Sequence, residues 1–431
     1  MHVVEQLANW AVEARATPFK EEVLHHARRA VIDWHAALYP GAIVAPATLL
    51  EKSLAEELDR GEASLALGRR ATVRAAAFIN GTAAHTVEVD DIFRDGIYHP
   101  GAPTIAAAYA VSKGSNLLRA VVVGYEISTR IGAAMGRAHY KYWHNTGTIG
   151  CFGACAAAAE ALGLDRRRFA HALATVATFS AGLQQAFRMD SMSKPLHAGH
   201  AAEAGVTAAL AAREGVTGSL DIMEGDAGYG RAMGDNPDWA KALATLGKVF
   251  HITRMTFKNH ACCGHTFAAI DGALALKQKL NISASEIERI EVATYRAGLE
   301  VAHYDNPRTP AEARFSLKYV VATALAHGSV RLAAFEEKRL RDETTRALMK
   351  RIEVSLDPKL DAAFPAQRAA RVAIQAQGRR EEHLQPTRIG DPDAPLSDSQ
   401  LEEKYLELAA PVVGEKMAKE QLRRLWSLDA R

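Results

Sequence analysis

The sequence predicts a mainly helical protein made of a large all-helical domain and a smaller α+β domain. Up to about residue 270, apolar and alanine positions recur at spacings of three and four, the period of a helix. Near residue 281 the pattern changes to alternation, and from Ser397 the helical period returns. We therefore expect a helical domain over 1–270 that helices within 397–431 complete, and an α+β domain over 271–396.

The helical part shows its period clearly in the second segment of the chain. The recurring apolar positions there are Val23, Ala27, Ala30, Val31 and Trp34. Asp165, before RRRFAHALATVATFSAGL, and Thr146, before a run of glycine and alanine, are expected to be N-caps. So many small residues allow helices to approach closely, which favours a dense helical core.

Three stretches in the smaller part alternate apolar and polar positions, as strands do. The positions that define them are Ile290, Val292 and Thr294, then Ile352 and Val354, then Val372 and Ile374. A helical run, RFSLKYVVATALAHG, separates the first two, so the pattern predicts an α+β layer. The helical tail, SDSQLEEKYLELAAPVV and EKMAKEQLRRLWSLD, is expected to pack on the helical domain.

Composition narrows the function classes. The 431 residues carry a net charge of +2, so bulk electrostatics favours neither nucleic acid nor an acidic membrane surface as a partner. No apolar run reaches the roughly 20 residues of a membrane span, and the amino terminus does not have the pattern of a signal peptide. Four cysteines are too few for a disulfide scaffold in a chain of this size. These features predict a cytoplasmic protein.

The first candidate site is the stretch 81–103, GTAAHTVEVDDIFRDGIYHPGAP. It gathers the carboxylates Glu88, Asp90 and Asp91 with the imidazoles of His85 and His99 inside an alanine-rich chain. We interpret it as one wall of an active site for a small polycarboxylate. The alternative is that Asp90 and Asp91 only cap a helix or bind a backbone amine.

The second and third candidates are helix starts. In YKYWHNTGTIGCFG, His144 precedes the expected cap Thr146, and backbone amides at a helix start favour a carboxylate. In SMSKPLHAGHAAEAG, Lys194 and His197 share one helix face, and a lysine at a helix start is better explained by a nearby anion. The alternatives are glycines that allow close packing and an exposed lysine with surface histidines.

The fourth candidate is FKNHACCGHTF, where Lys258 and His265 flank the pair Cys262 and Cys263. Adjacent cysteines rarely converge on one metal ion, and no second half-site is present, so we predict no metal site. The cysteines are expected to be small buried hydrophobic residues, which leaves Lys258 and His265 as the functional candidates.

Together the four segments indicate general acid–base chemistry. The sequence contains no serine elbow, dinucleotide fingerprint or metal motif. Several cations with a few carboxylates suit a multiply charged acid, because cations hold its carboxylates and stabilise the charge that forms when a proton is removed beside one.

These segments also carry a resemblance to a known family. NGTAAHTVEVDDIF, HPGAP, HNTGTIGCFGA, SKPLHAGHAAEAG, FKNHACCGHTF and RFSLKYVVA resemble, in order, the segments of the MmgE/PrpD family. That family includes 2-methylcitrate dehydratase, cis-aconitate decarboxylase and iminodisuccinate epimerase. The resemblance implies an all-helical domain with a smaller α+β lid domain, a homodimer and a cleft between the domains. It also implies no metal or organic cofactor.

The resemblance assigns expected roles to single residues. The expected catalytic residues are His99, His144, Lys194, Asp90 and Asp91. The expected substrate-binding residues are Glu88, Lys258, His265, His197, Tyr142 and Thr146. Three positions depart from the family pattern: Glu88 replaces an aspartate, Asn145 a proline and Phe267 a histidine. Each changes the size or hydrogen bonding of a pocket, so the substrate can differ from those of well-known members.

The function predicted from these residues is that of a cofactor-independent hydro-lyase acting on a small di- or tricarboxylate such as 2-methylcitrate. One of His99, His144 or Lys194 would remove the proton next to a carboxylate, and another would protonate the leaving hydroxyl. Two alternatives share the carbanion: an epimerase of an imino- or amino-dicarboxylate, and a decarboxylase of the cis-aconitate type. The remaining alternative, from a different class of protein, is a non-catalytic helical dimer that binds an anion.

Overall fold

The computed structural model describes residues 1–112, 116–187 and 191–429. Helices account for 59% of it and strands for 10%, which confirms the prediction of a mainly helical fold with a smaller α+β region. The chain divides into two units. The first comprises residues 1–257 and 397–431, and the second comprises residues 258–396.

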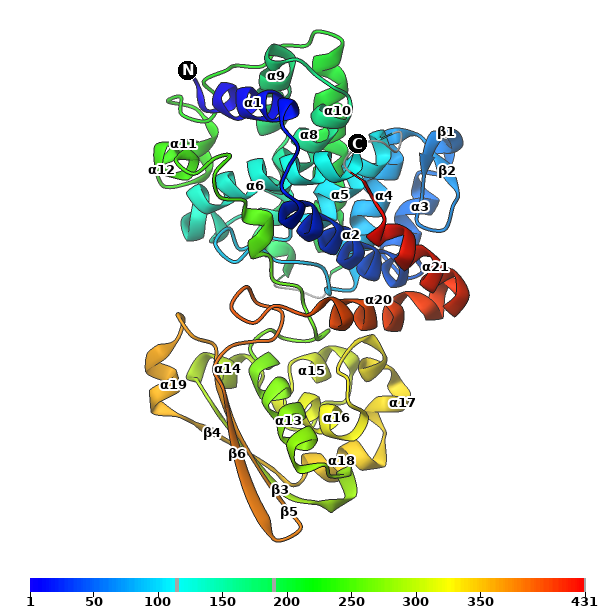
Figure 1. Cartoon of the computed structure of the whole chain (residues 1–431), viewed down its shortest axis with the longest axis vertical. Helices are drawn as coiled ribbons and strands as arrows, with labels where there is room; N and C mark the ends of the chain where they lie inside the picture. The colour runs from blue at the N-terminus through cyan, green and yellow to red at the C-terminus, as the bar shows by residue number, and fades with distance from the viewer. Residues whose placement is uncertain (113–115, 188–190, 430–431) are drawn as a thin grey trace. The chain divides into compact units, whose positions relative to one another are not determined.

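The first unit is an assembly of helices (Figure 1). They are α1 (Val3–Glu13), α2 (Glu21–Ala42), α3 (Ala47–Ser53), α4 (Val73–Thr86), α5 (Gly101–Val111), α6 (Leu117–Tyr140), α7 (Asn145–Thr148), α8 (Gly150–Ala161), α9 (Arg166–Ala177), α10 (Ser193–Arg213), α11 (Tyr229–Met233), α12 (Trp239–Leu243), α20 (Asp398–Val413) and α21 (Glu415–Trp426). All five apolar positions that predicted the second helix are buried in α2. The Asp165 side chain accepts a hydrogen bond from the Arg168 amide at 2.9 Å, which confirms its predicted role as an N-cap.

Glycine brings two helices of this core into close contact. A Cβ atom on Gly199 of α10 would lie 2.1 Å from Thr82 Oγ1 and 2.3 Å from the Phe78 carbonyl oxygen of α4. A Cβ atom on Gly81 of α4 would lie 3.0 Å from Gly199 Cα. The two helices are therefore as close as direct contact between their backbones allows. Both helices also carry candidate site residues.

The first unit also contains a short hairpin that the sequence analysis did not predict. Strands β1 (Leu58–Ser64) and β2 (Arg70–Ala71) pair antiparallel. The sequence of β1, LDRGEAS, has no β-branched residue and is mostly exposed, so it lacks the alternation by which a strand is recognised.

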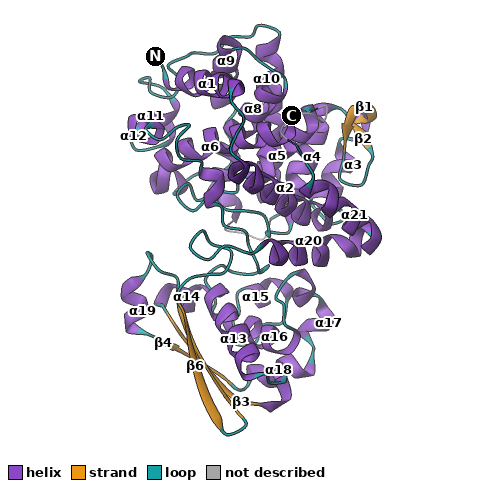
Figure 2. Cartoon of the chain, viewed as in Figure 1, coloured by secondary structure: helices purple, strands orange, loops and turns teal. Residues whose placement is uncertain are grey.

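The second unit combines helices with a four-stranded sheet (Figure 2). Its elements are α13 (Phe267–Leu280), β3 (Ile287–Thr294), α14 (Arg296–Val301), α15 (Pro310–Arg314), α16 (Leu317–His327), α17 (Glu337–Leu340), α18 (Glu343–Met349), β4 (Ile352–Leu356), α19 (Pro358–Ala363), β5 (Ala370–Ala376) and β6 (Arg379–Gln385). The strand order is β4-β3-β5-β6, with β3 and β4 parallel and the other pairs antiparallel. Helix α13 packs on β5 and β6.

The apolar positions that predicted three strands face one another in this sheet. Ile290 of β3 lies opposite Ile352 of β4 and Ile374 of β5. Val292 of the same strand lies opposite Val354 and Val372. Strand β6 was not predicted, because its sequence RREEHLQ has one apolar residue, Leu384, and no apolar alternation. As an edge strand it pairs only with β5 and leaves many side chains in solvent.

A buried ion pair ties the C-terminal helices to the first unit. The Lys404 ammonium of α20 donates to Asp33 Oδ1 of α2 at 2.5 Å and to the Val89 carbonyl oxygen at 2.7 Å. Lys404 and Asp33 are each 1% exposed. Val89 immediately precedes Asp90, so this lysine also fixes the backbone beside a candidate site residue.

Buried His35 makes a pH-dependent contribution to stability. Its Nδ1 contacts the Val31 carbonyl oxygen at 2.8 Å within α2, and burial lowers the pKa of His35 to about 4. Because this folded-state pKa lies below the unfolded value near 6.5, the unfolded chain binds the proton first as the pH falls. The contribution is complete above about pH 6.5 and is lost as the pH falls toward 4.

We expect the wild-type protein to lose about 2 kcal/mol more stability than His35→Gln between pH 7 and pH 5. Urea unfolding of both proteins at the two pH values measures this difference. Equal losses would show that His35 does not titrate on unfolding.

Within the described residues, no helix combines the length and apolar character that crossing a membrane requires.

Candidate functional site

The first unit gathers most of the predicted site residues. His85 lies in the last turn of α4, and Glu88, Asp90, Asp91 and His99 follow on the loop to α5. His144 and Thr146 lie at and within the short helix α7, and Lys194 and His197 lie in the first two turns of α10.

Asp90 lies between two imidazole rings. Its Oδ2 atom is 2.8 Å from His85 Nδ1 and 3.2 Å from His99 Nδ1. The two rings are 4.7 Å apart between centroids. His85 and Asp90 are buried, whereas 14% of the His99 side chain is exposed. Asp90 thus faces His99 at Nδ1, and Nε2 is the ring nitrogen on the opposite side that is available for a ligand.

The electrostatics of this group favour an ionised Asp90. Burial alone would raise the pKa of Asp90, but His99 and His85 outweigh it and hold that pKa well below its usual range. The carboxylate is therefore charged at neutral pH and faces both imidazoles.

A second imidazole pair adjoins the first. His144 Nδ1 and His197 Nδ1 are 3.1 Å apart, so one of the two nitrogens carries a hydrogen and the other accepts it. The His144 ring also stacks on His85 at 5.5 Å between centroids. Burial, with the nearby His85, holds the pKa of His144 well below its usual range and lowers the pKa of His197 to about 4. Both rings are neutral at neutral pH and can accept a proton. We call His85, Asp90, His99, His144 and His197 the histidine cluster.

Thr146 contacts the cluster in a way that the sequence did not suggest. Helix α7 has His144 as its N-cap residue, and no side chain caps it, so the expectation that Thr146 is an N-cap was wrong. The Thr146 hydroxyl oxygen instead accepts a hydrogen bond from the His99 amide at 3.2 Å. The reason is local: the chain already turns at His144, whose carbonyl oxygen accepts from the amides of Gly147 and Thr148.

The two adjacent aspartates have different surroundings. Asp91 Oδ1 accepts from the Gly101 amide at 2.9 Å, and its Oδ2 accepts from the Tyr125 hydroxyl at 2.7 Å. Burial raises the pKa of Asp91 to about 8, with the nearby Asp33 adding to the rise. These contacts hold the start of α5 against α6, whereas Asp90 holds the imidazoles.

Lys194 and Glu88 form an ion pair beside the cluster. The Lys194 ammonium contacts Glu88 Oε1, and the two side chains are 22% and 38% exposed. Glu88 has a φ of 61°, in the left-handed region that ordinary residues rarely adopt. Such a conformation costs on the order of 1 kcal/mol and is most often retained at functional sites.

Tyr142 lies outside these contacts. Its side chain is 61% exposed, and the Lys141 ammonium lies 5.1 Å from the centre of its ring.

The remaining two predicted residues belong to the second unit. Lys258 is 9% exposed, and His265 Nδ1 lies 2.8 Å from the Tyr295 hydroxyl. Burial, together with the nearby charges of Arg368 and Arg388, lowers the pKa of His265 to about 4. The Cys262 thiol lies 3.3 Å from the Thr266 hydroxyl, and burial raises the pKa of Cys262 to about 12. This thiol is therefore a poor nucleophile.

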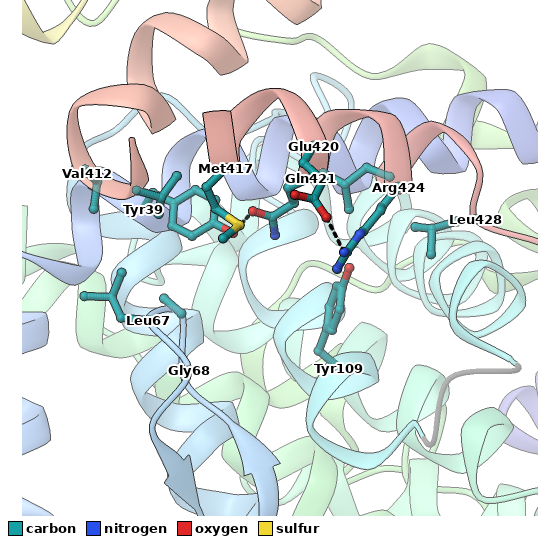
Figure 3. Close-up of a pocket in the computed structure, with 13 residues that line it drawn as sticks. Tyr39, Leu67, Gly68, Tyr109, Val412, Met417, Glu420, Gln421, Arg424 and Leu428 are labelled. Atoms are coloured by element: carbon teal, nitrogen blue, oxygen red, sulfur yellow. Dashed lines mark hydrogen bonds and ion pairs between the residues drawn. The ribbon is translucent and has the colours of Figure 1, made fainter. Parts of the chain in front are cut away.

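A separate cavity of about 590 Å³ opens in the first unit among α2, α5, α20 and α21 (Figure 3). Tyr39 and Gln421 form a hydrogen bond at its wall, and Arg424 pairs with Glu420 above the Tyr109 ring. The described residues that line it include none of the predicted site residues. This cavity is therefore distinct from the histidine cluster.

His85 belongs to the first candidate segment, but the sequence assigned it no individual catalytic or binding role. It is fully buried, contacts Asp90, packs edge-to-face against His99 and stacks on His144. Its signal was the spacing of five residues to Asp90 across a helix end, which places both side chains on the same side of the turn.

The chain thus has a helical unit with buried imidazoles around an ionised carboxylate, followed in sequence by an α+β unit. Two family models match the chain: the MmgE/PrpD N-terminal domain over residues 5–242 and the MmgE/PrpD C-terminal domain over residues 260–429. The chain belongs to the MmgE/PrpD family.

Curated relatives match at low identity. A cis-aconitate decarboxylase-like protein of Aspergillus oryzae is 25% identical, over 96% of this chain and 91% of its own length. The cis-aconitate decarboxylase of Homo sapiens is 27% identical, over 77% of this chain and 71% of its own length. The 2-methylcitrate dehydratase of Salmonella typhimurium is 27% identical over only 26% of this chain and 25% of its own length.

Proposed function

We propose that this protein is a lyase that acts on a small di- or tricarboxylate by general acid–base catalysis at the histidine cluster. The observation that carries the proposal is Asp90, whose charged carboxylate lies 3.2 Å from His99 Nδ1. A carboxylate in this position fixes the tautomer of the imidazole, so that Nε2 exchanges a proton with the substrate.

The neighbouring groups supply the other parts of the reaction. Neutral His144 is a second proton acceptor, because its depressed pKa keeps the ring uncharged. Lys194 is a cation beside the cluster, suited to bind a carboxylate and to stabilise the negative charge that forms next to it. We propose that Lys258 and His265 of the second unit bind substrate carboxylates. A homodimeric assembly and a cytoplasmic location remain proposals from the sequence.

The histidine cluster suits two lyase reactions of a polycarboxylate, dehydration and decarboxylation. In the predicted dehydration, a base removes the proton next to a carboxylate, the electron pair forms a carbon–carbon double bond, and hydroxide leaves as water after protonation. In decarboxylation, the bond to a carboxylate breaks, carbon dioxide leaves, and an acid protonates the carbanion that remains. Dehydration needs a base and an acid, decarboxylation needs an acid, and both need a cation for the negative charge.

Decarboxylation is the second candidate because of the coverage of the relatives. Those that align with most of this chain are named cis-aconitate decarboxylase or cis-aconitate decarboxylase-like, whereas the dehydratase aligns over about a quarter. The cluster geometry is compatible with both reactions.

The test is incubation of the purified protein with cis-aconitate, citrate and 2-methylcitrate in deuterated water. Dehydration gives an alkene with loss of water, decarboxylation gives carbon dioxide and deuterium in the product, and epimerisation gives exchange without loss of mass. No turnover or exchange with any small polycarboxylate would overturn the proposal.

Glu88 offers a test of how Lys194 is used. Glu88→Gln removes the negative charge that Lys194 contacts, so the lysine interacts more strongly with a substrate carboxylate. We expect the KM of a tricarboxylate to fall more than that of a dicarboxylate, with kcat changing less than KM. Steady-state kinetics of both variants and both substrate types measures this, with Glu203→Gln, which removes the charge that pairs with exposed Arg74, as the matched control. Equal KM values in wild type and Glu88→Gln would contradict a substrate-binding role for Lys194.

A further inference from the structure

We propose that the cavity among α2, α5, α20 and α21 binds the anion of an apolar monocarboxylic acid, of the medium-chain fatty acid class. Its volume of about 590 Å³ lies within the range of ligand-binding pockets. Every described residue that lines it belongs to the first unit, and none belongs to the histidine cluster. The inference therefore goes beyond the proposed function and does not rest on it.

Much of the cavity wall is apolar. The β1–β2 turn, the end of α20, α21 and the residues after it supply the side chains of Leu67, Val412, Val413, Met417, Leu425 and Leu428. Leu67 and Met417 are 57% and 53% exposed. An aliphatic chain laid against this wall removes apolar surface of both partners from water, which favours binding. The unbranched Met417 side chain adapts its shape to such a chain.

A group of hydrogen-bond donors faces the same cavity (Figure 3). The Tyr109 hydroxyl of α5 points toward the Arg424 side chain of α21, and it has no hydrogen-bond partner among the described residues. Burial raises the pKa of Tyr109 above its usual value, so the hydroxyl keeps its hydrogen at neutral pH. A half-buried hydroxyl without a partner favours a ligand that accepts a hydrogen bond.

Gln421 supplies a second donor from α21. Its side-chain oxygen accepts hydrogen bonds from the hydroxyls of Tyr39 and, at 3.4 Å, Tyr405. The amide nitrogen of the same side chain has no partner in the part of the chain that the structure describes. Because its oxygen is already engaged, Gln421 offers a ligand N–H groups rather than an acceptor.

The charges limit the ligand to one carboxylate. Glu420 and Arg424 pair with each other, and they are the charged residues among the described ones that line the cavity. The Arg424 guanidinium uses one nitrogen in that pair and keeps further N–H groups for a carboxylate. A second carboxylate would have to lie against apolar side chains, which is costly. The cavity therefore suits an aliphatic monocarboxylate and not the polycarboxylates proposed for the histidine cluster.

The test is isothermal calorimetry of the full-length protein with sodium octanoate, in the absence of any polycarboxylate. We expect one saturable site per chain. Octanol, which lacks the carboxylate, should bind more weakly, and octanedioate, which has a second one, should bind at least about 100-fold more weakly than octanoate.

Three variants assign the binding to this cavity. Tyr109→Phe removes the hydroxyl and keeps the ring that stacks on Trp34 at 5.3 Å, so it should weaken the Kd for octanoate by about 10-fold. Arg424→Gln should weaken octanoate by about 5-fold and leave octanol unchanged, since only the first ligand is charged. Glu420→Gln should tighten octanoate by about 3-fold, because it removes the negative charge that competes for Arg424.

Arg423→Gln is the matched control, because Arg423 is the exposed neighbour of Arg424 on α21 and does not line the cavity. Its Kd should equal that of the wild type, and circular dichroism should show that all variants fold. The absence of saturable octanoate binding, or binding that neither Tyr109→Phe nor Arg424→Gln weakens, would overturn the proposal. So would a dimer without octanoate binding that Met417→Asp splits in light scattering, because a second copy of the chain would then cover the cavity. Octanoate binding is measured without turnover, so it fails separately from the proposed lyase activity.

Discussion

Replacing His99 with asparagine is expected to lower kcat by about 10²–10⁴-fold while leaving the fold intact. The amide nitrogen of asparagine takes the place of Nδ1 and can keep the contact with Asp90, which lies 3.2 Å away in the wild-type protein. The variant has no counterpart of Nε2, so it cannot exchange a proton with the substrate. Steady-state kinetics and a thermal melt of the same preparation measure both parts of the expectation.

The control for this experiment is His200→Gln. His200 lies on α10 like His197, but its Nε2 contacts the Phe179 carbonyl oxygen at 3.3 Å rather than the histidine cluster. Its kcat should stay at the wild-type value. A kcat in His99→Asn within a few-fold of wild type would remove His99 from the reaction and shift the acid–base role to His144.

Replacing Lys404 with methionine is expected to destabilise the protein by about 3–5 kcal/mol, the range for breaking one side of a buried pair. The Asp33 carboxylate would remain buried at 1% exposure without its cation, and the Val89 carbonyl would lose its donor. Burial already raises the pKa of Asp33 to about 6 in spite of Lys404, which shows how costly that charge is. Urea unfolding at pH 7.5 measures the loss.

Lys419→Met provides the comparison on the neighbouring helix α21. Lys419 pairs with Glu415, but the two side chains are 57% and 73% exposed, so its removal should change stability by no more than about 0.5 kcal/mol. The double variant Asp33→Asn with Lys404→Met should recover part of the loss, because no unpaired charge remains. A Lys404→Met protein as stable as Lys419→Met would show that the pair contributes little.

Sequence patterns predicted the fold wherever side chains repeat with a strong period. The spacing of its buried residues reveals helix α2. Alternating apolar and polar residues reveal β3 and β5, and their apolar residues lie opposite one another in the sheet. Strands β1 and β6 were missed for a physical reason: their side chains are largely exposed, so burial imposes no apolar alternation on them. Both are strands because they form backbone hydrogen bonds with a neighbouring strand, and their own side chains carry no signal of that pairing.

The candidate site shows a similar division. Residue types near small residues pointed to Asp90, His99, His144 and Lys194, but adjacency could not show which aspartate meets a histidine. Asp90 and Asp91 differ only in the side of the chain to which each points, and that depends on the backbone path between α4 and α5. Its residue type suggested that Thr146 caps a helix. In the structure its hydroxyl oxygen accepts a hydrogen bond from the amide of His99, 47 residues earlier in the chain. Contacts over long sequence separations determine these roles.

The contact between Gly81 and Gly199 limits which substitutions this protein can accept at the α4–α10 helix pair. His85 extends from one of these helices, and Lys194 and His197 extend from the other. Any side chain larger than hydrogen at Gly199 would meet atoms 2.1 Å and 2.3 Å away, so the helices would have to separate by a discrete step. Acid–base groups tolerate displacements of only about 0.5 Å. Substitutions at this helix pair would therefore displace the imidazoles, whereas the Glu88 side chain, which is 38% exposed, can change without moving either helix.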